Sequence, residues 1–148
     1  MTLQELIDAV QGTPIRLSPE TEFRGVTLDS RNVAPGTVFW AFPGTNHDGH
    51  DFILQAQQSG AVACVVRKDR LTNRMSSVIA VEDTARALED FARWNRLRNE
   101  ALVIGVTGSV GKTTTREMIY SVLSEKFQGI RNRKNYNNEI GLPLTLLE

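Results

Sequence analysis

The sequence has one cysteine, no long apolar run and no excess of charge of either sign. Cys64 is the single cysteine, so the chain cannot form an internal disulfide. No stretch approaches the roughly 20 apolar residues of a membrane span, and the first residues lack the basic start and apolar core of a signal peptide. Basic and acidic residues number 17 each, so no overall field attracts nucleic acid or an anionic membrane. These absences favour a cytoplasmic globular protein that meets any anion with local groups.

Glycine is concentrated in the most informative stretch, residues 101–115. An apolar run over 101–106 is typical of a buried parallel strand, and a helix is expected to begin at Lys112. Between them, Gly105, Gly108 and Gly111 allow a tight turn whose N–H groups point at an anion, beside the positive end of the helix dipole. The predicted nucleotide-binding residues are Gly108, Ser109, Val110, Gly111, Lys112, Thr113 and Thr114.

This glycine loop predicts a phosphate site of the P-loop type. Lys112 would supply an ammonium to the β and γ phosphates of ATP, and the hydroxyl of Thr113 would complete the shell of a Mg²⁺ ion. The usual pattern has its first glycine where this chain has Val106, so the loop is a variant form. The alternative is a tight strand-to-helix connection with no ligand, which the Lys-Thr-Thr sequence makes less favourable.

The first 98 residues are predicted to fold as a small α/β domain. A capping box at Thr2 and Glu5 begins a helix that Gly12 ends, and Asp51 and Asp83 are expected to cap two further helices. Strands are expected at 26–28, 38–42, 61–66 and 77–81, with helices at 3–10, 52–59 and 84–99. Cys64 then lies in a buried strand, as a core thiol rather than a nucleophile.

Residues 99–148 are expected to be the start of a second domain, the parallel-sheet ATP-binding unit. It offers the strand at 101–106 and a helix from Lys112 to about Phe127, with Met118, Ile119, Val122 and Leu123 facing inward. One strand does not make a sheet, and no later apolar strand ends in Asp or Glu to hold a metal. The expectation is the N-terminal part of a larger enzyme, interrupted inside its nucleotide domain.

Several motifs together resemble the Mur ligases, ATP-dependent enzymes that build the peptide of the bacterial peptidoglycan precursor. They are Leu28-Asp29-Ser30-Arg31, Asp48-Gly49-His50-Asp51-Phe52 and the glycine loop to Thr114, and they span the chain. The segment Asn137-Asn138-Glu139-Ile140-Gly141 is similar to that of the branch that adds D-alanyl-D-alanine. The neighbouring branch, which adds the third peptide residue, usually has a different segment there.

The resemblance implies where substrates bind. The UDP end of the precursor would meet Leu28, Ser30, Arg31, Thr45, Asn46 and His47, and the muramoyl part would lie near Asn137 and Asn138. From the residues alone, 29–31 is equally an ordinary turn, and 137–139 is a polar segment that begins a helix. A metal site among His47, Asp48, His50 and Asp51 is less favoured, because Asp51 serves better as a helix cap.

The resemblance also implies a reaction. ATP would phosphorylate the terminal carboxylate of UDP-N-acetylmuramoyl-tripeptide, and the amine of D-alanyl-D-alanine would attack the acyl phosphate, with Lys112 and Thr113 as the catalytic residues of this segment. The residues that capture the amine would lie in the remainder of the ligase, so the isolated chain is expected to have little turnover. The alternatives are a ligase for the third residue, or a non-catalytic module that binds a UDP-sugar or nucleotide.

Overall fold

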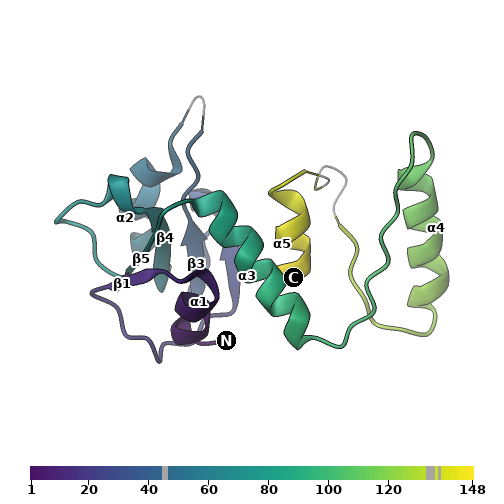
Figure 1. Cartoon of the computed structure of the whole chain (residues 1–148), viewed down its shortest axis with the longest axis horizontal. Helices are drawn as coiled ribbons and strands as arrows, with labels where there is room; N and C mark the ends of the chain where they lie inside the picture. Colours follow the sequence, from purple (N-terminus) through teal and green to yellow (C-terminus); the bar gives the residue numbers. More distant parts are fainter. Residues whose placement is uncertain (45–46, 133–135, 137) are drawn as a thin grey trace.

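The structure is a computed structural model that describes residues 1–44, 47–132, 136 and 138–148. Five strands and five α-helices are assigned within these ranges (Figure 1). The strands are β1 (Thr13–Ile15), β2 (Gly25–Thr27), β3 (Thr37–Trp40), β4 (Ala63–Arg67) and β5 (Val78–Val81). The helices are α1 (Leu3–Val10), α2 (Ile53–Gln58), α3 (Thr84–Arg98), α4 (Lys112–Ser124) and α5 (Gly141–Leu147), with 3₁₀ turns η1 (Ser30–Asn32), η2 (Gly49–Phe52) and η3 (Lys68–Arg70).

All five strands form one sheet in the order β1-β5-β4-β3-β2. Strands β2 to β5 are parallel to their neighbours, whereas β1 is antiparallel to β5. The four parallel strands were expected from the sequence, but β1 was not. It has three residues and contains Pro14, which is tolerated at a sheet edge and removes the usual strand signal.

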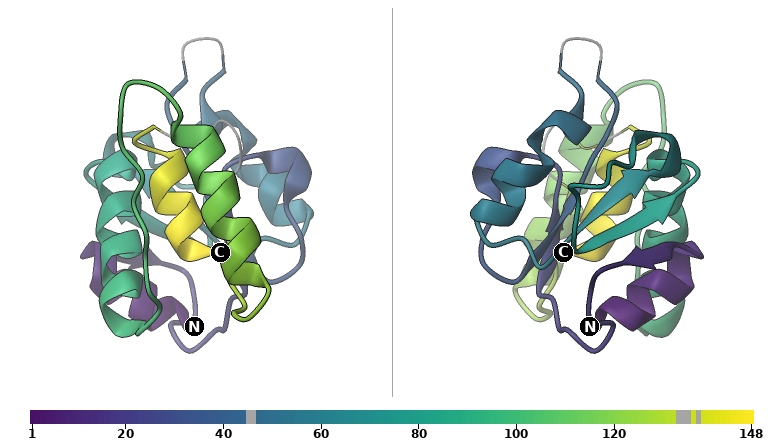
Figure 2. Two further views of the ribbon diagram at one scale, coloured as in Figure 1. Left: turned by 90° about the vertical axis from the view of Figure 1, so that its right-hand side faces the viewer. Right: turned by 90° about the vertical axis from the view of Figure 1, so that its left-hand side faces the viewer.

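The sheet is buried on both faces, as a parallel sheet requires. Alternate residues such as Trp40, Val65 and Ile79 pack with α1 and α3 in one core. Their neighbours, including Phe39 and Cys64, pack with α2 in a second core on the opposite face (Figure 2). This layered arrangement confirms the predicted α/β class.

Local capping was predicted correctly at two helices and wrongly at one. The Thr2–Glu5 capping box is present, and Asp83 accepts from the backbone N–H groups of Ala85 and Arg86 at the start of α3. The Asp51 cap was wrong, because Asp48 caps η2 instead and α2 begins without a side-chain cap. The chain turns three residues earlier than expected, so the capping carboxylate is the earlier one.

Helix α1 ends before Gly12 as expected, but the residue in the left-handed conformation is Gln11, with φ of 50°. The N–H of Gly12 bonds to the carbonyl of Ile7 and closes the end of the helix.

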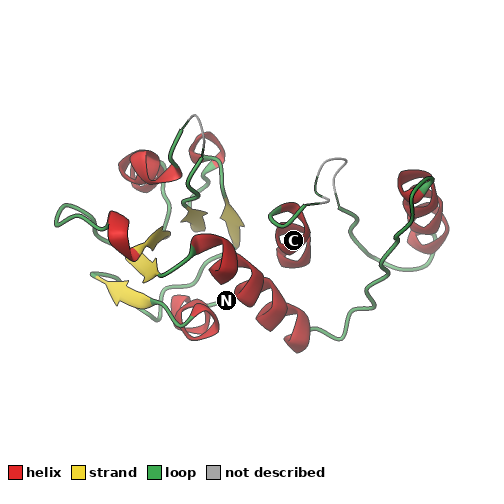
Figure 3. Cartoon of the chain, turned by 45° about the horizontal axis from the view of Figure 1, so that its top comes forward, coloured by secondary structure: helices red, strands yellow, loops and turns green. Residues whose placement is uncertain are grey.

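Residues 101–106 do not form the predicted strand. Leu102, Val103 and Ile104 are 84%, 50% and 47% exposed, and the segment runs as a loop between α3 and α4 (Figure 3). A strand needs a neighbour to satisfy its N–H and C=O groups, and none of the described residues pairs with it. The apolar run alone was therefore insufficient.

Helix α4 begins at Lys112 as predicted and ends three residues earlier than expected. The inward orientation of its apolar face was wrong for this chain, since none of its residues is buried and Met118 and Val122 are 64% and 72% exposed. Helix α5, by contrast, returns to the first unit (Figure 1). Ile140, Leu144 and Leu147 pack against the core that contains α3, and the side chain of Asn95 donates to the carbonyl of Leu146 at 2.9 Å.

The predicted division at residue 98 therefore separates the sheet from α4, whereas α5 packs against the sheet unit. The division itself stays a prediction. Within the described ranges, no helix combines the length and apolar character needed to cross a membrane.

Candidate functional site

The glycine loop turns at two glycines that have positive φ. Gly108 and Gly111 have φ of +145° and +85°, values that residues with a Cβ rarely adopt, and Gly111 is the N-cap of α4. A Cβ on Gly105 would meet no atom within 4 Å, and its φ is not positive, so nothing in this structure requires a glycine there. Two of the three glycines are therefore explained by the turn.

The loop also presents donors. Among the residues that the structure describes, no acceptor is recorded for the backbone N–H groups of 108–114, and the first such bond is from Thr115 to the Gly111 carbonyl. The ammonium of Lys112 lies 2.5 Å from the carbonyl oxygen of Gly108, so it is held over the loop. Thr113 follows on the first turn of α4, where its side chain is exposed. Unpaired amides, a helix N-terminus and an ammonium are together the donor set that a polyphosphate needs.

A cavity of about 570 Å³ lies beside this loop, from Thr113 along one face of α4. Its charged lining is organised around Glu117, which is 2.9 Å from Nη2 of Arg116 and 3.0 Å from Nε of Arg131. The Arg131 guanidinium also lies 4.1 Å from the ring centroid of Tyr120. The lining of the cavity therefore includes one carboxylate shared by two guanidinium groups.

Sequence reasoning missed Arg116 and did not identify Arg131 as a site residue. Arg116 also donates to the side chain of Asn132 at 3.1 Å, and Asn132 donates to the carbonyl of Tyr136 at 3.0 Å. The position of Arg116 one turn after Lys112 was the available sequence signal, because residues at i and i+4 share a helix face.

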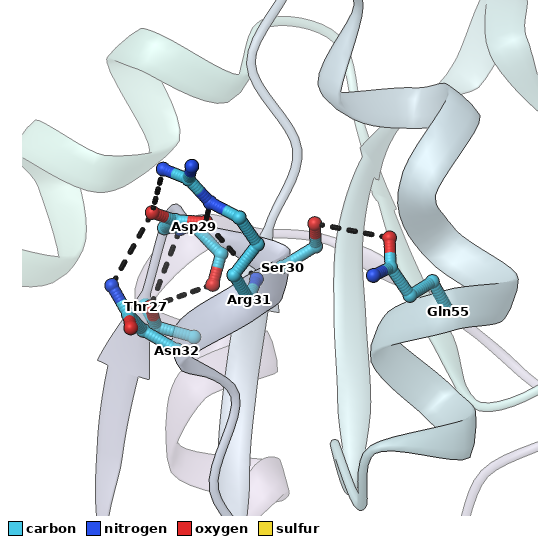
Figure 4. Close-up of polar contacts among 6 residues, drawn as sticks. All are labelled: Thr27, Asp29, Ser30, Arg31, Asn32 and Gln55. Carbon is cyan, nitrogen blue, oxygen red and sulfur yellow. Dashed lines mark hydrogen bonds and ion pairs between the residues drawn. The ribbon is translucent and has the colours of Figure 1, made fainter.

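Three predicted UDP contacts follow β2, at the carboxyl edge of the sheet (Figure 4). Leu28 is partly buried against the core, and the Ser30 hydroxyl donates to the side-chain oxygen of Gln55 in α2 at 3.3 Å. Arg31 folds back over Asp29, with its Nε and Nη2 2.9 and 2.7 Å from the two carboxylate oxygens. The Arg31 side chain remains 81% exposed, so the other edge of its guanidinium faces solvent.

Asp29 organises this turn. Its carboxylate accepts from the side chain of Arg31, from the backbone N–H of Arg31 and from Asn32. The side-chain hydrogen bonds from Arg31, followed by the backbone bond, lower the pKa of Asp29 to about 2. The carboxylate is therefore charged at neutral pH, and it fixes both the turn and the arginine. This geometry is compatible with both interpretations of 29–31, as an ordinary turn and as a turn that contacts the substrate.

The second predicted UDP segment follows β3. Thr45 and Asn46 lie outside the described residues. His47 is exposed, and its ring meets that of Phe52 edge to face with centroids 6.3 Å apart. The described residues contain no group of three His, Cys, Asp or Glu side chains that could hold a metal. His50 and Asp48 instead bond to each other, at 2.6 Å.

The third predicted segment precedes α5. Asn137 lies outside the described residues. The side-chain oxygen of Asn138 accepts from the backbone N–H of Gly141 at 2.8 Å, so this side chain supports the start of α5. This contact matches the helix-start alternative for the segment. The amide nitrogen of Asn138 is not used by that bond.

The predicted residues thus form two groups. Leu28, Ser30, Arg31 and His47 lie at the carboxyl edge of the sheet, while Gly108 to Gly111 precede α4 and Lys112 to Thr114 begin it, at the other end of the molecule from α2 (Figure 1). Asn138 lies in the segment that connects α4 with α5.

Comparisons with known proteins identify the family of both parts of the chain. A family model described as Mur ligase family, catalytic domain, matches residues 22–96, and the Mur ligase middle domain matches residues 106–148. A UDP-N-acetylmuramoyl-tripeptide–D-alanyl-D-alanine ligase from Synechocystis sp. is 44% identical over 135 residues, which are 89% of this chain and 29% of that protein.

Solved structures give the same result. The structure of MurF from Acinetobacter baumannii has a TM-score of 0.88 at 36% identity, over 99% of this chain and 32% of that one. MurF from Thermotoga maritima in complex with ADP has a TM-score of 0.74 at 39% identity, over 83% of this chain and 28% of that one. A ligase for 2,6-diaminopimelate is 21% identical with a TM-score of 0.57 over 99% of this chain and 32% of that one, a likeness of fold alone. The chain spans about a third of the length of the relatives that it matches.

Proposed function

The chain belongs to the Mur ligase family, and on that premise we propose that it is part of an ATP-dependent ligase that joins D-alanyl-D-alanine to UDP-N-acetylmuramoyl-tripeptide. The observation that carries the proposal is the loop before α4, where unpaired amides and the Lys112 ammonium converge. The relatives that support it carry this ligase name at up to 44% identity. A cytoplasmic location stays a prediction.

The proposed chemistry begins with the peptide carboxylate, a poor electrophile whose negative charge repels a nucleophile. The carboxylate oxygen attacks the γ-phosphorus of ATP, the bond to the bridging oxygen breaks, and ADP leaves. The amine of D-alanyl-D-alanine then attacks the acyl carbon, the C–O bond to phosphate breaks, and the amine loses a proton. The amides of 108–114 and the Lys112 ammonium would stabilise charge on the β and γ oxygens in the first step.

The Thr113 hydroxyl, exposed on the first turn of α4, would hold Mg²⁺. When bound, this ion supplies further positive charge at the phosphates. The chain provides one hydroxyl ligand for it, so the remaining protein ligands would come from the rest of the ligase.

The carboxyl edge of the sheet would receive the UDP end of the precursor. Strand ends of parallel sheets gather loop residues at one edge, where ligands commonly bind. Leu28 offers an apolar contact, Ser30 is fixed by Gln55, and the exposed edge of Arg31 can meet phosphate oxygens. His47 would contribute from the neighbouring strand end, together with Thr45 and Asn46. Asn138, and Asn137 beside it, would face the muramoyl part.

The ligase for the third peptide residue is the less favoured alternative. Relatives of the D-alanyl-D-alanine branch reach 36–44% identity, whereas the diaminopimelate ligase is 21% identical. A non-catalytic module is likewise disfavoured, because both family models match in the order expected of one ligase chain.

Calorimetry with Mg-ATP tests the nucleotide site in this chain. We expect saturable binding in the wild type and its loss in Lys112→Ala, because the ammonium over the loop is removed. Lys126→Ala is the matched control, since Lys126 lies just beyond the other end of α4 and contacts only the Phe127 ring among the described residues. Equal binding by Lys112→Ala and the wild type would contradict the nucleotide assignment.

The choice of substrate is tested in the full-length ligase that contains this segment. Phosphate release should depend on UDP-N-acetylmuramoyl-tripeptide together with D-alanyl-D-alanine. Turnover only with the dipeptide precursor and a diamino acid would instead support the alternative branch. We expect the isolated chain to show no substrate-dependent release.

A further inference from the structure

His50 is the one histidine whose side chain is buried, and both of its ring nitrogens are used. Its Nδ1 lies 2.6 Å from Oδ1 of Asp48, and its Nε2 accepts from the backbone N–H of Arg67 at 3.0 Å. The backbone N–H of His50 donates to the same Asp48 oxygen, at 3.0 Å. The other oxygen of Asp48 is 2.8 Å from Nη2 of Arg70. We call Asp48, His50, Arg67 and Arg70 the histidine clamp.

These contacts determine the protonation state of the ring. An N–H group must donate, so Nε2 of His50 accepts from Arg67 only if it carries no proton. The proton of a neutral ring is then on Nδ1, where it is donated to the Asp48 carboxylate. The clamp therefore requires a neutral His50 ring in the Nδ1–H form. A second proton, on Nε2, would leave the Arg67 N–H without its acceptor.

The clamp joins two neighbouring strand ends. Arg67 is the last residue of β4, while Asp48 and His50 belong to the segment that follows β3. The start of that segment is held by a bond from the Gly49 N–H to the carbonyl of Phe42, at 2.8 Å. A Cβ on Gly49 would lie 2.7 Å from the backbone nitrogen of Phe42, so only glycine permits this approach. The clamp thus fixes η2 at the carboxyl edge of the sheet.

The predicted UDP contacts after β2 and those after β3 both depend on the position of η2 and α2. The ring of His47 packs against Phe52 at the end of η2. Ser30 bonds to Gln55 in α2 (Figure 4). A movement of η2 and α2 would therefore displace His47 and the partner of Ser30 together.

We propose that His50 is a positioning residue for the UDP end of the substrate: its ring locks η2 to the end of β4, and loss of the contact with β4 releases η2 and weakens binding. The inference rests on the proposed function, because it concerns the same substrate edge. Both ring nitrogens of His50 are already bonded within the protein, so the residue acts through η2.

Two substitutions separate the two ring nitrogens. In His50→Gln, the side-chain oxygen can replace Nε2 as the acceptor for the Arg67 N–H. In His50→Asn, the amide can replace Nδ1 as the donor to Asp48 but leaves the Arg67 N–H without its acceptor, a costly loss in a buried site. Asp48→Asn has a matched control in Asp51→Asn, whose exposed carboxylate belongs to the same turn. Thermal unfolding of each variant establishes that it folds.

The first measurement is nitrogen NMR of the imidazole in the wild-type chain at about pH 8. We expect the Nδ1–H form, and we expect the amide signals of Arg67 and Gly49 to change more in His50→Asn than in His50→Gln. The Nε2–H form, or amide signals that are alike in the two variants, would overturn the clamp without reference to any ligand.

The second measurement is UDP affinity by calorimetry at about pH 8. We expect His50→Gln to bind UDP about as tightly as the wild type, because it keeps an acceptor for the Arg67 N–H, and His50→Asn to be weaker by about tenfold. Asp51→Asn should follow the wild type. If the clamp is seen by NMR and the wild type binds UDP, but all variants bind it alike, the positioning role is wrong. If the clamp is seen and the wild type binds no UDP, the UDP assignment fails while the clamp stands.

Discussion

Two apolar stretches of similar composition have opposite fates in this chain. Residues 61–66 read Ala-Val-Ala-Cys-Val-Val and supply the centre of β4, where Ala63 to Val66 are fully buried. Residues 102–106 read Leu-Val-Ile-Gly-Val, and Leu102 is 84% exposed. The difference lies in the neighbours: β4 is paired with β3 and β5, whereas no described strand pairs with 102–106. A buried strand is a property of the sheet around it, because both its hydrogen bonds and its covered faces come from other elements.

The same contrast holds for the helices. Helix α3 buries Leu88 and Phe91 completely, while α4 buries no residue. Each fully buried large side chain contributes about 1.5–3 kcal/mol, so the sheet unit holds the stability of the chain. The glycine loop lies in the unit that contributes little of this stability. This separation is what the following predictions test.

Thiol labelling gives the largest expected contrast. Burial raises the pKa of the Cys64 thiol to about 12 and removes it from reagent, so it should react only on global unfolding. A cysteine introduced as Val103→Cys in a Cys64→Ala background should react at once. We expect the rates with iodoacetamide at about pH 8 to differ by at least ~10³-fold, the ratio of folded to unfolded protein in a domain of ordinary stability. Both proteins unfolded in urea should react at similar rates.

Protection of the Val103→Cys thiol would break the comparison, because it would show that 102–106 is covered in solution. Fast labelling of Cys64 in the native chain would also contradict the comparison, because it would show that 61–66 is accessible in solution.

A pair of alanine substitutions tests the helices. Phe91 is fully buried and lies between the rings of Phe23, Trp40 and Trp94, with centroids 5.9–6.1 Å away. Phe91→Ala should reduce the free energy of unfolding by about 3–5 kcal/mol. Val122→Ala on the exposed face of α4 is the control, and it should change the free energy by less than about 0.5 kcal/mol. Urea unfolding followed by tryptophan fluorescence measures both. A large effect of Val122→Ala would show that α4 packs against the rest.

Much of the sheet unit could be predicted from sequence, because its signals are local and its partners are present. Short apolar runs located β2 to β5, and the caps at Thr2 and Asp83 located α1 and α3. The same signals failed at 101–106, where the pattern was correct and the neighbours were absent from the described structure. The strand there was wrong for a tertiary reason, not a local one.

The candidate site divides in the same way. The turn at Gly108 and Gly111 was predictable, since positive φ and glycine are linked within one residue. The histidine clamp was not, because the partner of Nε2 is a backbone N–H 17 residues away, and every residue has such a group. The sequence analysis also assigned the cap after β3 to Asp51 rather than Asp48.

The smallest predicted effect concerns the turn after β2 and sharpens the description of the substrate edge. The hydrogen bonds from Arg31 lower the pKa of Asp29 to about 2, below the ordinary value near 3.9. The stabilisation is therefore complete above pH 3.9 and is lost as the pH falls through about 2. Because Asp29 and Arg31 are both substantially exposed, it should amount to about 0.2–1 kcal/mol. In an NMR titration of the Asp29 carboxyl, Arg31→Ala should raise the midpoint towards 3.9. Asn32→Ala, which removes only the 3.3 Å contact, should move it less. An unchanged midpoint in Arg31→Ala would show that the arginine already points away from Asp29 in solution. The edge of the guanidinium that is proposed to meet UDP would then be a different one.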